Sequence, residues 1–196
     1  IDSSNLANIT LYGNWTGTWH ANQTITRTGT YNITNFTKTL SDGRYLWGAY
    51  VCDNENNCRS GTRNYTLTVD ATPPNVSAFY TTANNGNYSG TAVLNVSAYD
   101  ATAGVESVYV NITNTSGYQL YWNKTSRSGN YYNVSINTVG FADGNYYVNV
   151  SVNDSANNVN TSRIITTFDN TPPNVSTFYN TIKQFSVIHK NFCFYS

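Results

Sequence analysis

The feature that most constrains this chain is a stretch that occurs twice. Asp-Ala-Thr-Pro-Pro-Asn-Val-Ser at residues 70–77 returns as Asp-Asn-Thr-Pro-Pro-Asn-Val-Ser at residues 169–176, 99 residues later. Proline fixes φ at roughly −65° and holds the preceding residue extended, so each Thr-Pro-Pro predicts a short, semi-rigid joint. The residues before each joint end one strand and those after it begin another. An internal repeat of this kind predicts modules joined in line.

A second set of matches lies upstream of each joint. Asp42-Gly43 is matched by Asp143-Gly144, and Asp53 by Asp154, each 101 residues later. Between these turns runs a strand in which alternate positions match, and the period of two puts them on one inward face. These inward positions are Tyr45, Trp47, Ala49 and Val51 in the first strand, and Tyr146, Val148, Val150 and Val152 in the second.

The rest of the chain consists of short apolar–polar alternations separated by turn residues. They predict strands at residues 6–12, 45–51, 64–69, 91–97, 105–112, 119–122, 130–136 and 146–152, and residues 24–39 are also β-prone. About seven short strands in about 100 residues, with no helical periodicity, are typical of a β-sandwich. We therefore expect an all-β fold with two sandwiches in tandem.

The shared motif is a turn Asp-Gly-x-Tyr, a strand, a turn Asp-x-x-x-Asn, a last strand and Asp-x-Thr-Pro-Pro. It covers residues 42–74 and again residues 143–173. In this it resembles the immunoglobulin-like repeat modules of archaeal and bacterial cell-surface proteins. The resemblance implies two immunoglobulin-like modules, but such modules serve as spacers, adhesins and coat components alike, so it implies no single role.

The two ends of the chain match each other. We predict a first module at residues 1–71, a second at 72–170, and a segment at 171–196 that opens as the second module opens. The strand at residues 6–12 aligns with the one at 105–112, so the first module lacks its opening strands. The terminal segment carries apolar residues at alternate positions that suit a donated strand core: Phe185, Val187, Phe192 and Phe194.

The lengths agree with strand donation. From Pro74 to Asp100 is 26 residues, and from Pro173 through Ser196 to Asp2 of another copy is 25. On this alignment Phe192 and Phe194 fall on inward positions 94 and 96. Either separate copies donate strands head to tail, or the chain is one period of a longer polypeptide, and both arrangements give a linear array. An arbitrary fragment with an unstructured tail is the remaining alternative.

Charge and hydropathy exclude several kinds of partner. The formal net charge is zero and only 10% of residues are charged, without a basic or acidic run, so we expect no nucleic acid partner. The sequence contains no apolar run of the roughly 18 residues that span a bilayer, so we expect no membrane insertion in this segment. The chain does not begin with Met and shows no signal peptide, so Ile1 is predicted to be a processed end or an internal cut.

Asn-x-Ser/Thr, the acceptor tripeptide for N-linked glycans, is the strongest chemical signal. It occurs 17 times, against about 7 expected from 31 Asn and 46 Ser plus Thr in 196 residues. The middle residue is apolar in 12 cases, which on a strand puts Asn and Ser/Thr together on the solvent face. Accidental matches in an Asn/Thr-rich chain are the alternative to a glycan coat. The predicted sites are Asn8, Asn14, Asn22, Asn32, Asn35, Asn64, Asn75, Asn87, Asn95, Asn111, Asn114, Asn123, Asn133, Asn149, Asn153, Asn160 and Asn174.

The three cysteines and the Asp residues at module ends have structural interpretations. Cys52 and Cys58 bracket a turn, which predicts a disulfide that closes a loop in an oxidising compartment, with two free thiols as the alternative. Cys193 is then free or intermolecular. The turn residues Asp70, Asp100, Asp154 and Asp169 lack the spacing of a calcium loop, so we predict turn formation and no metal site.

No arrangement of residues predicts catalysis. His20 and His189, the two histidines, have no partners spaced for a metal or a triad, and phosphate loops and nucleophile motifs are absent from the sequence. We therefore expect neither enzymatic activity nor a cofactor. Trp15 and Trp19 lie in a Gly-bounded ribbon, where packing and sugar stacking are both open.

The combined expectation is a structural subunit of an extracellular filament on a cell surface. Its partners would be copies of itself, arranged head to tail, and its covalent N-linked glycans. The alternative is a segment of an adhesin or carbohydrate-binding stalk, which would remain monomeric and bind a glycan.

Overall fold

The structure is a computed structural model, which describes residues 5–79, 85–129 and 131–176. The predicted all-β class is confirmed: apart from one turn of 3₁₀-helix at Thr138–Gly140 (η1), every regular element in these ranges is a strand. The strands are β1 Leu6–Gly13, β2 His20–Thr26, β3 Gly43–Asp53, β4 Cys58–Ser60, β5 Tyr65–Val69, β6 Asn75–Phe79, β7 Gly86–Tyr88, β8 Thr91–Tyr99, β9 Val105–Asn114, β10 Gln119–Lys124, β11 Ser126–Ser128, β12 Tyr131–Asn137, β13 Gly144–Asp154 and β14 Val159–Phe168.

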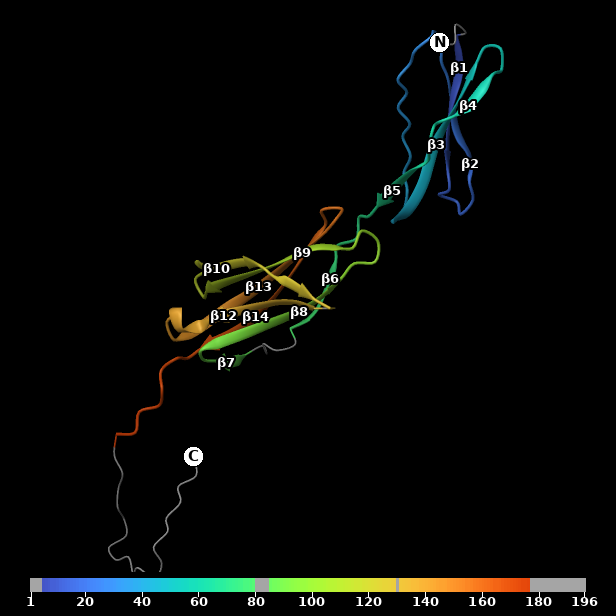
Figure 1. Cartoon of the computed structure of the whole chain (residues 1–196). Coiled ribbons are helices and arrows are strands. Elements are labelled where there is room, and N and C mark those ends of the chain that lie inside the picture. The colour runs from blue at the N-terminus through green and yellow to red at the C-terminus, as the bar shows by residue number, and fades with distance from the viewer. Residues whose placement is uncertain (1–4, 80–84, 130, 177–196) are drawn as a thin grey trace, which may run out of the picture.

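The strands form three sheets (Figure 1). Sheet A contains β1 to β5, in the order β2-β1-β3-β4, with β5 pairing further along β3. Sheet B has the order β11-β12-β8-β6, and sheet C the order β10-β9-β13-β14-β7. All ladders are antiparallel except the short parallel pair of β14 and β7. We call residues 5–71, which hold sheet A, the first unit, and residues 72–170, which hold sheets B and C, the second unit.

Sheets B and C pack face to face around the buried core. Alternate residues of each strand point into this space, as the pleat requires. Sheet B contributes Ala92, Leu94, Val96, Tyr132 and Ile136, and sheet C contributes Val108, Val110, Ile112, Tyr146, Val148, Val150, Val152 and Phe168. Among the described residues, the buried apolar side chains outside this cluster are Leu11 and Pro74 of the joint. The second unit is therefore a packed sandwich, and the buried core belongs to it.

Sheet A is built like sheet C. Ile9 pairs with Val51 as Val108 pairs with Val152, and Leu11 pairs with Ala49 as Val110 pairs with Val150. Strand β2 lies beside β1 as β10 lies beside β9, and β4 and β5 share the edge of β3 that corresponds to the β14 edge of β13. Among the described residues, the first unit has no counterpart of sheet B.

One predicted strand region is wrong in part. The β-prone stretch at residues 24–39 forms a strand only to Thr26, where β2 ends, and residues 27–42 belong to no strand. Local propensity was a poor guide here, because a strand needs a neighbour to pair with.

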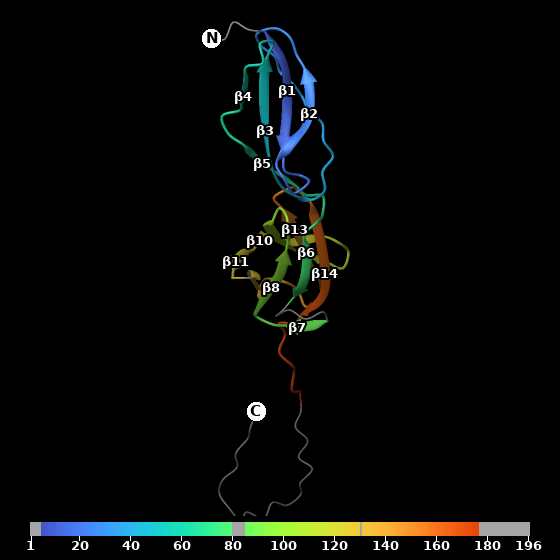
Figure 2. The ribbon, with the colours of Figure 1, turned by 90° about the vertical axis from the view of Figure 1, so that its right-hand side faces the viewer.

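The two units lie end to end (Figures 1 and 2). Hydrogen bonds fasten the joint and Asp70 before it to the second unit. The side-chain amide nitrogen of Asn158 donates to the Asp70 carbonyl (3.1 Å), and that of Asn160 donates to the Pro74 carbonyl (2.8 Å). The backbone N–H of Ala103 donates to the Asp70 carboxylate (3.0 Å). Residues 171–176 leave β14 at the end of the second unit remote from sheet A. Nowhere in the described ranges is there a helix with the length and hydropathy needed to cross a bilayer.

Candidate functional site

The candidate functional site is the inward face of sheet A. Its four predicted positions, Tyr45, Trp47, Ala49 and Val51, are all half-buried. The matching positions in β13 of the second unit are all buried, because sheet B covers them. The same pattern of side chains is therefore covered by a second sheet in the second unit and only partly covered in the first unit.

Strand β5 extends this face. Leu67 lies opposite Tyr45, and Tyr65 lies opposite Trp47, with the Tyr65 and Trp47 rings stacked at 5.2 Å between centroids. Directly opposite residues share a face, so Tyr65 and Leu67 belong to the inward side, and yet both are exposed. Tyr65 and Leu67 therefore expose apolar surface on a face whose counterpart in the second unit is core.

Residues 27–42 run along sheet A without forming a strand of it, although Arg27 and Gly29 still make backbone hydrogen bonds to Ala7 and Leu6 of β1. Aligned by the 101-residue repeat, Asn32-Ile-Thr corresponds to Asn133-Val-Ser in β12. Strand β12 is held by β8, where Tyr132 pairs with Val96 and Val134 with Leu94. Tyr31 is 78% exposed, whereas its counterpart Tyr132 is 7% exposed. The segment has the sequence of a sheet B strand, and the β8-type strand that would hold it is not among the described residues of the first unit.

Between this segment and sheet A lies a groove of about 440 Å³. Its apolar lining comes from Leu11 and Trp47 of the sheet, Phe36 and Leu40 of the segment, and Trp15. The Lys38 ammonium group lies over the Trp15 ring, 5.9 Å from the centroid. The Trp15 indole nitrogen is buried without a hydrogen-bond partner among the described residues. An incomplete cover over apolar side chains is consistent with a surface that accepts further strands.

The same turn closes the central hairpin of each unit. The Asp53 carboxylate accepts the backbone N–H groups of Glu55 and Asn57 and the Asn57 side-chain amide (2.8 to 3.0 Å). The Asp154 carboxylate does the same with Ala156 and Asn158 (2.8 to 2.9 Å). The sequence match at these positions thus reflects one repeated local structure.

A second repeated contact fastens the end of each unit to its central strand. The Thr72 hydroxyl and the Ala71 N–H donate to Asp42, and these two bonds hold the pKa of Asp42 below its ordinary value. At the next joint, the Asn170 N–H and the Thr171 hydroxyl donate to Asp143 and lower its pKa in the same way. Hydrogen bonds to a carboxylate favour its charged form, which is the cause of both shifts.

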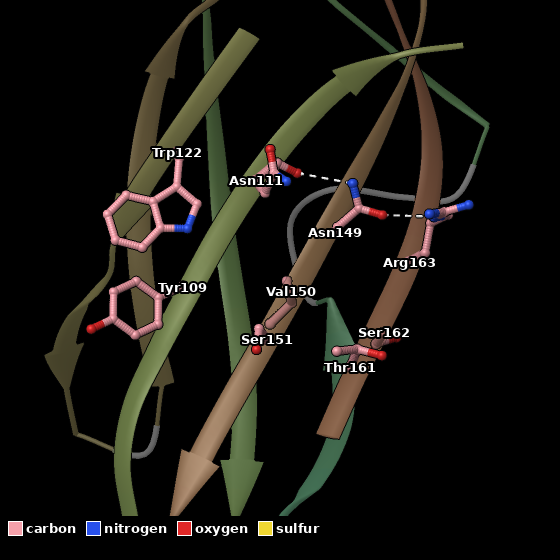
Figure 3. Close-up of a pocket in the computed structure, with 9 residues that line it drawn as sticks. All are labelled: Tyr109, Asn111, Trp122, Asn149, Val150, Ser151, Thr161, Ser162 and Arg163. Carbon is pink, nitrogen blue, oxygen red and sulfur yellow. Dashed lines mark hydrogen bonds between the residues drawn. The ribbon is translucent and has the colours of Figure 1, made fainter. Parts of the chain in front are cut away.

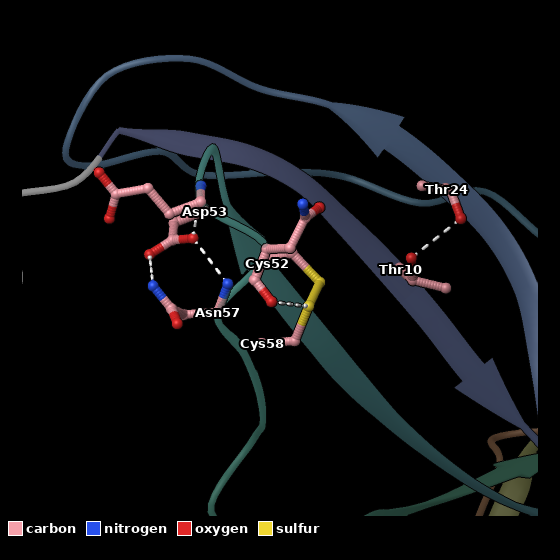
Figure 4. The surroundings of a disulfide bond; sticks show 8 residues. Thr10, Thr24, Cys52, Asp53, Asn57 and Cys58 are labelled. Carbon is pink, nitrogen blue, oxygen red and sulfur yellow. Dashed lines mark hydrogen bonds between the residues drawn. A yellow bond between two sulfur atoms is a disulfide. The ribbon is translucent and has the colours of Figure 1, made fainter.

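Cys52 and Cys58 are joined by a disulfide, with 4.1 Å between their Cα atoms (Figure 4). They are cross-strand partners in the hairpin of β3 and β4, directly beside the Asp53 turn. Across the sheet, the Thr10 and Thr24 hydroxyls share a hydrogen bond of 2.9 Å. The hairpin therefore carries a covalent bond at the position where the second unit pairs Asn153 with Val159.

Sequence reasoning missed a convergence of three carboxylates at the joint. Oxygens of Asp70, Asp100 and Asp154 lie within 4.8 Å of one another, with Asp154 buried and the other two half-buried. They come from three loops far apart in the sequence. Each carboxylate accepts backbone N–H groups of its own turn, as predicted for turn-forming aspartates. These are the described residues whose oxygens could share a cation, and the turn contacts are sufficient to explain their positions.

All 17 predicted glycan acceptors lie in the described ranges, and none is buried. One group is exposed: Asn32, Asn35, Asn64, Asn75, Asn87, Asn123 and Asn174. The other group is half-buried: Asn8, Asn14, Asn22, Asn95, Asn111, Asn114, Asn133, Asn149, Asn153 and Asn160. The Asn160 side-chain nitrogen donates to the Pro74 carbonyl at the joint, so modification of Asn160 would break that contact.

The remaining predicted residues are dispersed. Trp19 is exposed and stacks on Tyr12 with 6.1 Å between centroids, whereas Trp15 lines the groove. The Nδ1 atom of His20 lies 2.8 Å from the Thr18 carbonyl oxygen. His189, Cys193 and the predicted strand core of Phe185, Val187, Phe192 and Phe194 lie outside the described residues.

Comparisons with known proteins give fold similarity only. Neither a family model nor a curated protein matches the sequence. Among solved structures, a tetra-tandem repeat from the extending region of a large adhesion protein is 18% identical, with a TM-score of 0.42 over 85% of this chain and 42% of that one. A 1.5-MDa bacterial ice-binding adhesin is 17% identical, with a TM-score of 0.38 over 86% and 55%. An endo-β-1,4-mannanase from Thermotoga petrophila is 12% identical, with a TM-score of 0.44 over 52% and 21%. The chain thus spans well under two thirds of each of these structures, and similarity at this level supports no functional conclusion.

Proposed function

We propose that this chain is a structural subunit of a heavily N-glycosylated extracellular filament on a cell surface. It consists of two immunoglobulin-like modules, and the first is completed by the C-terminal segment of the preceding copy or period. The observation that carries the proposal is the contrast between two matched faces. The inward residues of β3 are half-buried, whereas the same positions of β13 are buried beneath sheet B.

The missing layer has a defined form. In the second unit it is formed by β6 and β8, which with the short strand β7 between them are the first strands after the Thr-Pro-Pro joint. Residues 171–196 follow the next joint in the same way. The predicted inward positions also support the proposal. Phe192 and Phe194 align with Leu94 and Val96, which are both buried. The donated strands would therefore place aromatic side chains over the open face of sheet A.

Strand donation would supply the two things that the first unit lacks, a backbone partner for residues 30–36 and a cover for sheet A. A β8-type strand would give residues 30–36 a backbone partner, and extended backbone added to a sheet edge gains a ladder of hydrogen bonds. It would also bury the inward side chains of sheet A, at about 25 cal/mol per Å² of apolar surface removed from water. Because sheet A and residues 171–176 lie at opposite ends of the chain, the contact is heterologous and generates a linear array.

Glycans would cover the sides of this array. None of the 17 acceptor asparagines is buried, and they occur on both units. A dense sugar layer adds bulk and solubility at the surface, and it protects strand edges from unwanted pairing.

The decisive experiment compares the full chain with a chain that ends at Ser176, so that the described units are kept and the proposed donor is removed. We expect linear polymers of the full chain by light scattering and negative-stain microscopy, and monomers of the shortened chain. The double variant Phe192→Asp/Phe194→Asp should behave as the shortened chain does. A full chain that stays monomeric contradicts the proposal, and if it also binds immobilised glycans it is an adhesin stalk segment instead.

The covalent form of the array needs a separate measurement. Intact mass of the material from its source, under denaturing conditions and before and after deglycosylation, gives the sugar load and the polypeptide length. A polypeptide of this chain's length indicates strand exchange between copies, whereas a longer one indicates a continuous repeat. A mass unchanged by deglycosylation contradicts the glycan coat.

A further inference from the structure

The outer face of sheet C carries a groove that the proposed assembly does not use. Its volume is about 580 Å³, and its lining comes from four adjacent strands, β10, β9, β13 and β14 (Figure 3). Cross-strand register places Trp122, Asn111, Asn149 and Arg163 in one row across these strands. Tyr109 lies two residues before Asn111, on the same face of β9.

One end of the groove is a flat aromatic platform. The rings of Tyr109 and Trp122 are stacked at 4.8 Å between centroids, with an angle of 14° between their planes. Trp122 is 57% exposed on the edge strand β10, so a face of its ring is open to solvent. The Lys124 ammonium group lies 5.9 Å from the Tyr109 centroid. In this nearly parallel stack Tyr109 backs the Trp122 ring, so the open side of Trp122 presents an apolar surface without further loss of side-chain freedom.

The other end of the groove is polar and held in place. The Asn149 amide nitrogen donates to the Asn111 carbonyl (3.3 Å), and the Arg163 Nε donates to the Asn149 amide oxygen (2.6 Å). The Arg163 guanidinium also stacks over Tyr147, 4.7 Å from the ring centroid. The side-chain oxygen of Asn111 is the exception, because it is buried without a hydrogen-bond partner among the described residues. An unpaired acceptor of this kind costs about 1–3 kcal/mol.

An apolar platform beside amide and hydroxyl groups suits one class of ligand. The faces of sugar rings carry C–H groups that pack on aromatic rings, and their edges carry hydroxyls that bond to amides. No carboxylate is among the residues that line this groove, and its charged lining residue is Arg163, so it would accept neutral or acidic sugars. We propose that this groove is a saccharide-binding site, with a sugar ring on the exposed Trp122 ring, which Tyr109 backs, and its hydroxyls toward Asn111 and Ser151.

The saccharide has two sources that share this chemistry. One is the N-linked glycan of Asn111 itself, which rests on the proposed glycosylation. Asn111 begins an Asn-Ile-Thr acceptor tripeptide and lies opposite Trp122. The neighbouring acceptor Asn149 has both polar atoms of its side-chain amide engaged, whereas the Asn111 amide oxygen has no partner among the described residues. The other source is a saccharide of another molecule.

The same arrangement recurs along the second unit. The pattern Tyr-x-Asn-x-Ser/Thr begins at Tyr109, Tyr121, Tyr131 and Tyr147. On a strand, the period of two puts the tyrosine on the same face as the acceptor asparagine, one step before it. At Asn123, the side-chain nitrogen donates to the Tyr121 hydroxyl (3.2 Å), which shows that the two side chains meet. The Asn111 site differs from the others in having Trp122 as a second ring.

The first arm of the test addresses the covalent source. The full chain is made in a host with N-glycosylation and in one without it, and glycopeptide mass spectrometry determines whether Asn111 is modified. We expect the modified wild type to melt a few degrees higher than Asn111→Gln. In the Trp122→Leu background, which keeps an apolar side chain but removes the ring, that difference should disappear. Tyr118→Leu, an exposed aromatic outside the groove, is the matched control and should preserve it.

The second arm addresses an external saccharide. The chain made without glycans is titrated with chitotriose and with mannotriose, followed by tryptophan fluorescence and by NMR of the Asn111 and Asn149 amides. We expect one of these sugars to bind, and Trp122→Leu to weaken binding at least tenfold while Tyr118→Leu does not. If a sugar binds here and the first arm finds Asn111 unmodified, the result supports a saccharide of another molecule as the ligand.

The inference is overturned if neither arm gives a Trp122-dependent effect. This result is distinguishable from failure of the filament proposal, because polymerisation is measured by light scattering and depends on sheet A and residues 177–196. The groove lies on sheet C, so Phe192→Asp/Phe194→Asp should leave both arms unchanged.

Discussion

At the scale of single residues, repeated contacts explain why the sequence repeats where it does. Asp53 and Asp154 organise the same turn, in which Asn56 and Asn157 both adopt a positive φ of 64° and 70°. Asparagine tolerates that conformation better than other residues with a Cβ. Tyr45 and Tyr146 each donate a hydroxyl hydrogen bond to a carbonyl four residues earlier, at Ser41 and Ala142. These contacts are local, so the sequence was sufficient to predict the turns.

The disulfide gives the first stability prediction. Replacing both Cys52 and Cys58 by serine should lower the free energy of unfolding by about 2 kcal/mol, because the short loop regains entropy in the unfolded chain. Urea unfolding followed by tryptophan fluorescence measures the change. Cys193→Ser serves as the control and should have no effect. An unchanged unfolding midpoint in the double variant would show that the bond does not stabilise the first unit.

The two joint aspartates give a prediction for acid. Hydrogen bonds lower the pKa of Asp42 and Asp143 in the folded chain. Their contribution to the free energy of unfolding is therefore complete above the pKa of an unfolded Asp, about 3.9. It is lost as the pH falls through the lower pKa of the folded chain. We expect the wild-type Tm to fall more steeply below about pH 4 than that of Asp42→Asn/Asp143→Asn. Equal slopes in a series of thermal melts from pH 7 to pH 2 would contradict this.

At the scale of strands, the sequence predicted what local alternation determines and missed what depends on a neighbour. The inward positions of β13 are buried as predicted, because a pleated strand next to a second layer leaves them no other place. Residues 27–42 have β propensity and still form no strand, and under the proposed strand donation their pairing depends on a β8-type partner. The carboxylate cluster and the sheet C groove were also missed. Each brings together residues from three or four elements, and the spacing of these residues in the sequence does not indicate that they meet.

The proposed strand exchange fixes a register that can be tested by cross-linking. In the second unit Asn133 lies opposite Asn95. The repeat places Asn32 at the position of Asn133, and Cys193 aligns with Asn95. Asn32→Cys should therefore lie opposite Cys193 of a neighbouring copy, at the Cα separation of about 4.5–5.5 Å that a disulfide accepts. Mild oxidation should give a ladder of covalent multimers on non-reducing gels.

Two control variants make the register result specific. Cys193→Ser in the Asn32→Cys background should abolish the ladder. Thr34→Cys lies two residues further along the same face, at the diagonal distance of about 7–8 Å, and should cross-link more slowly. Equal rates for Asn32→Cys and Thr34→Cys would show that the strands are not paired in this register.

At the scale of the whole molecule, the proposal predicts that the donor works as a separate peptide. A peptide of residues 171–196 added to the chain that ends at Ser176 should slow amide hydrogen exchange in β1 and β3 of sheet A. Exchange in β9 and β13 should not change, because sheet B already covers them. The same peptide with Phe192→Asp and Phe194→Asp is the control. Identical exchange with both peptides would contradict strand donation.

Sheet A occupies one end of the molecule and residues 171–176 leave from the other. If such molecules join in a row, the row has a direction, and its two tips are chemically unlike. At one tip the apolar face of sheet A stays half-covered, and at the other the donor segment has no acceptor. Growth can then be started, stopped or tethered at a single tip by one factor that fits it, and the thread would need no change in any subunit along its length.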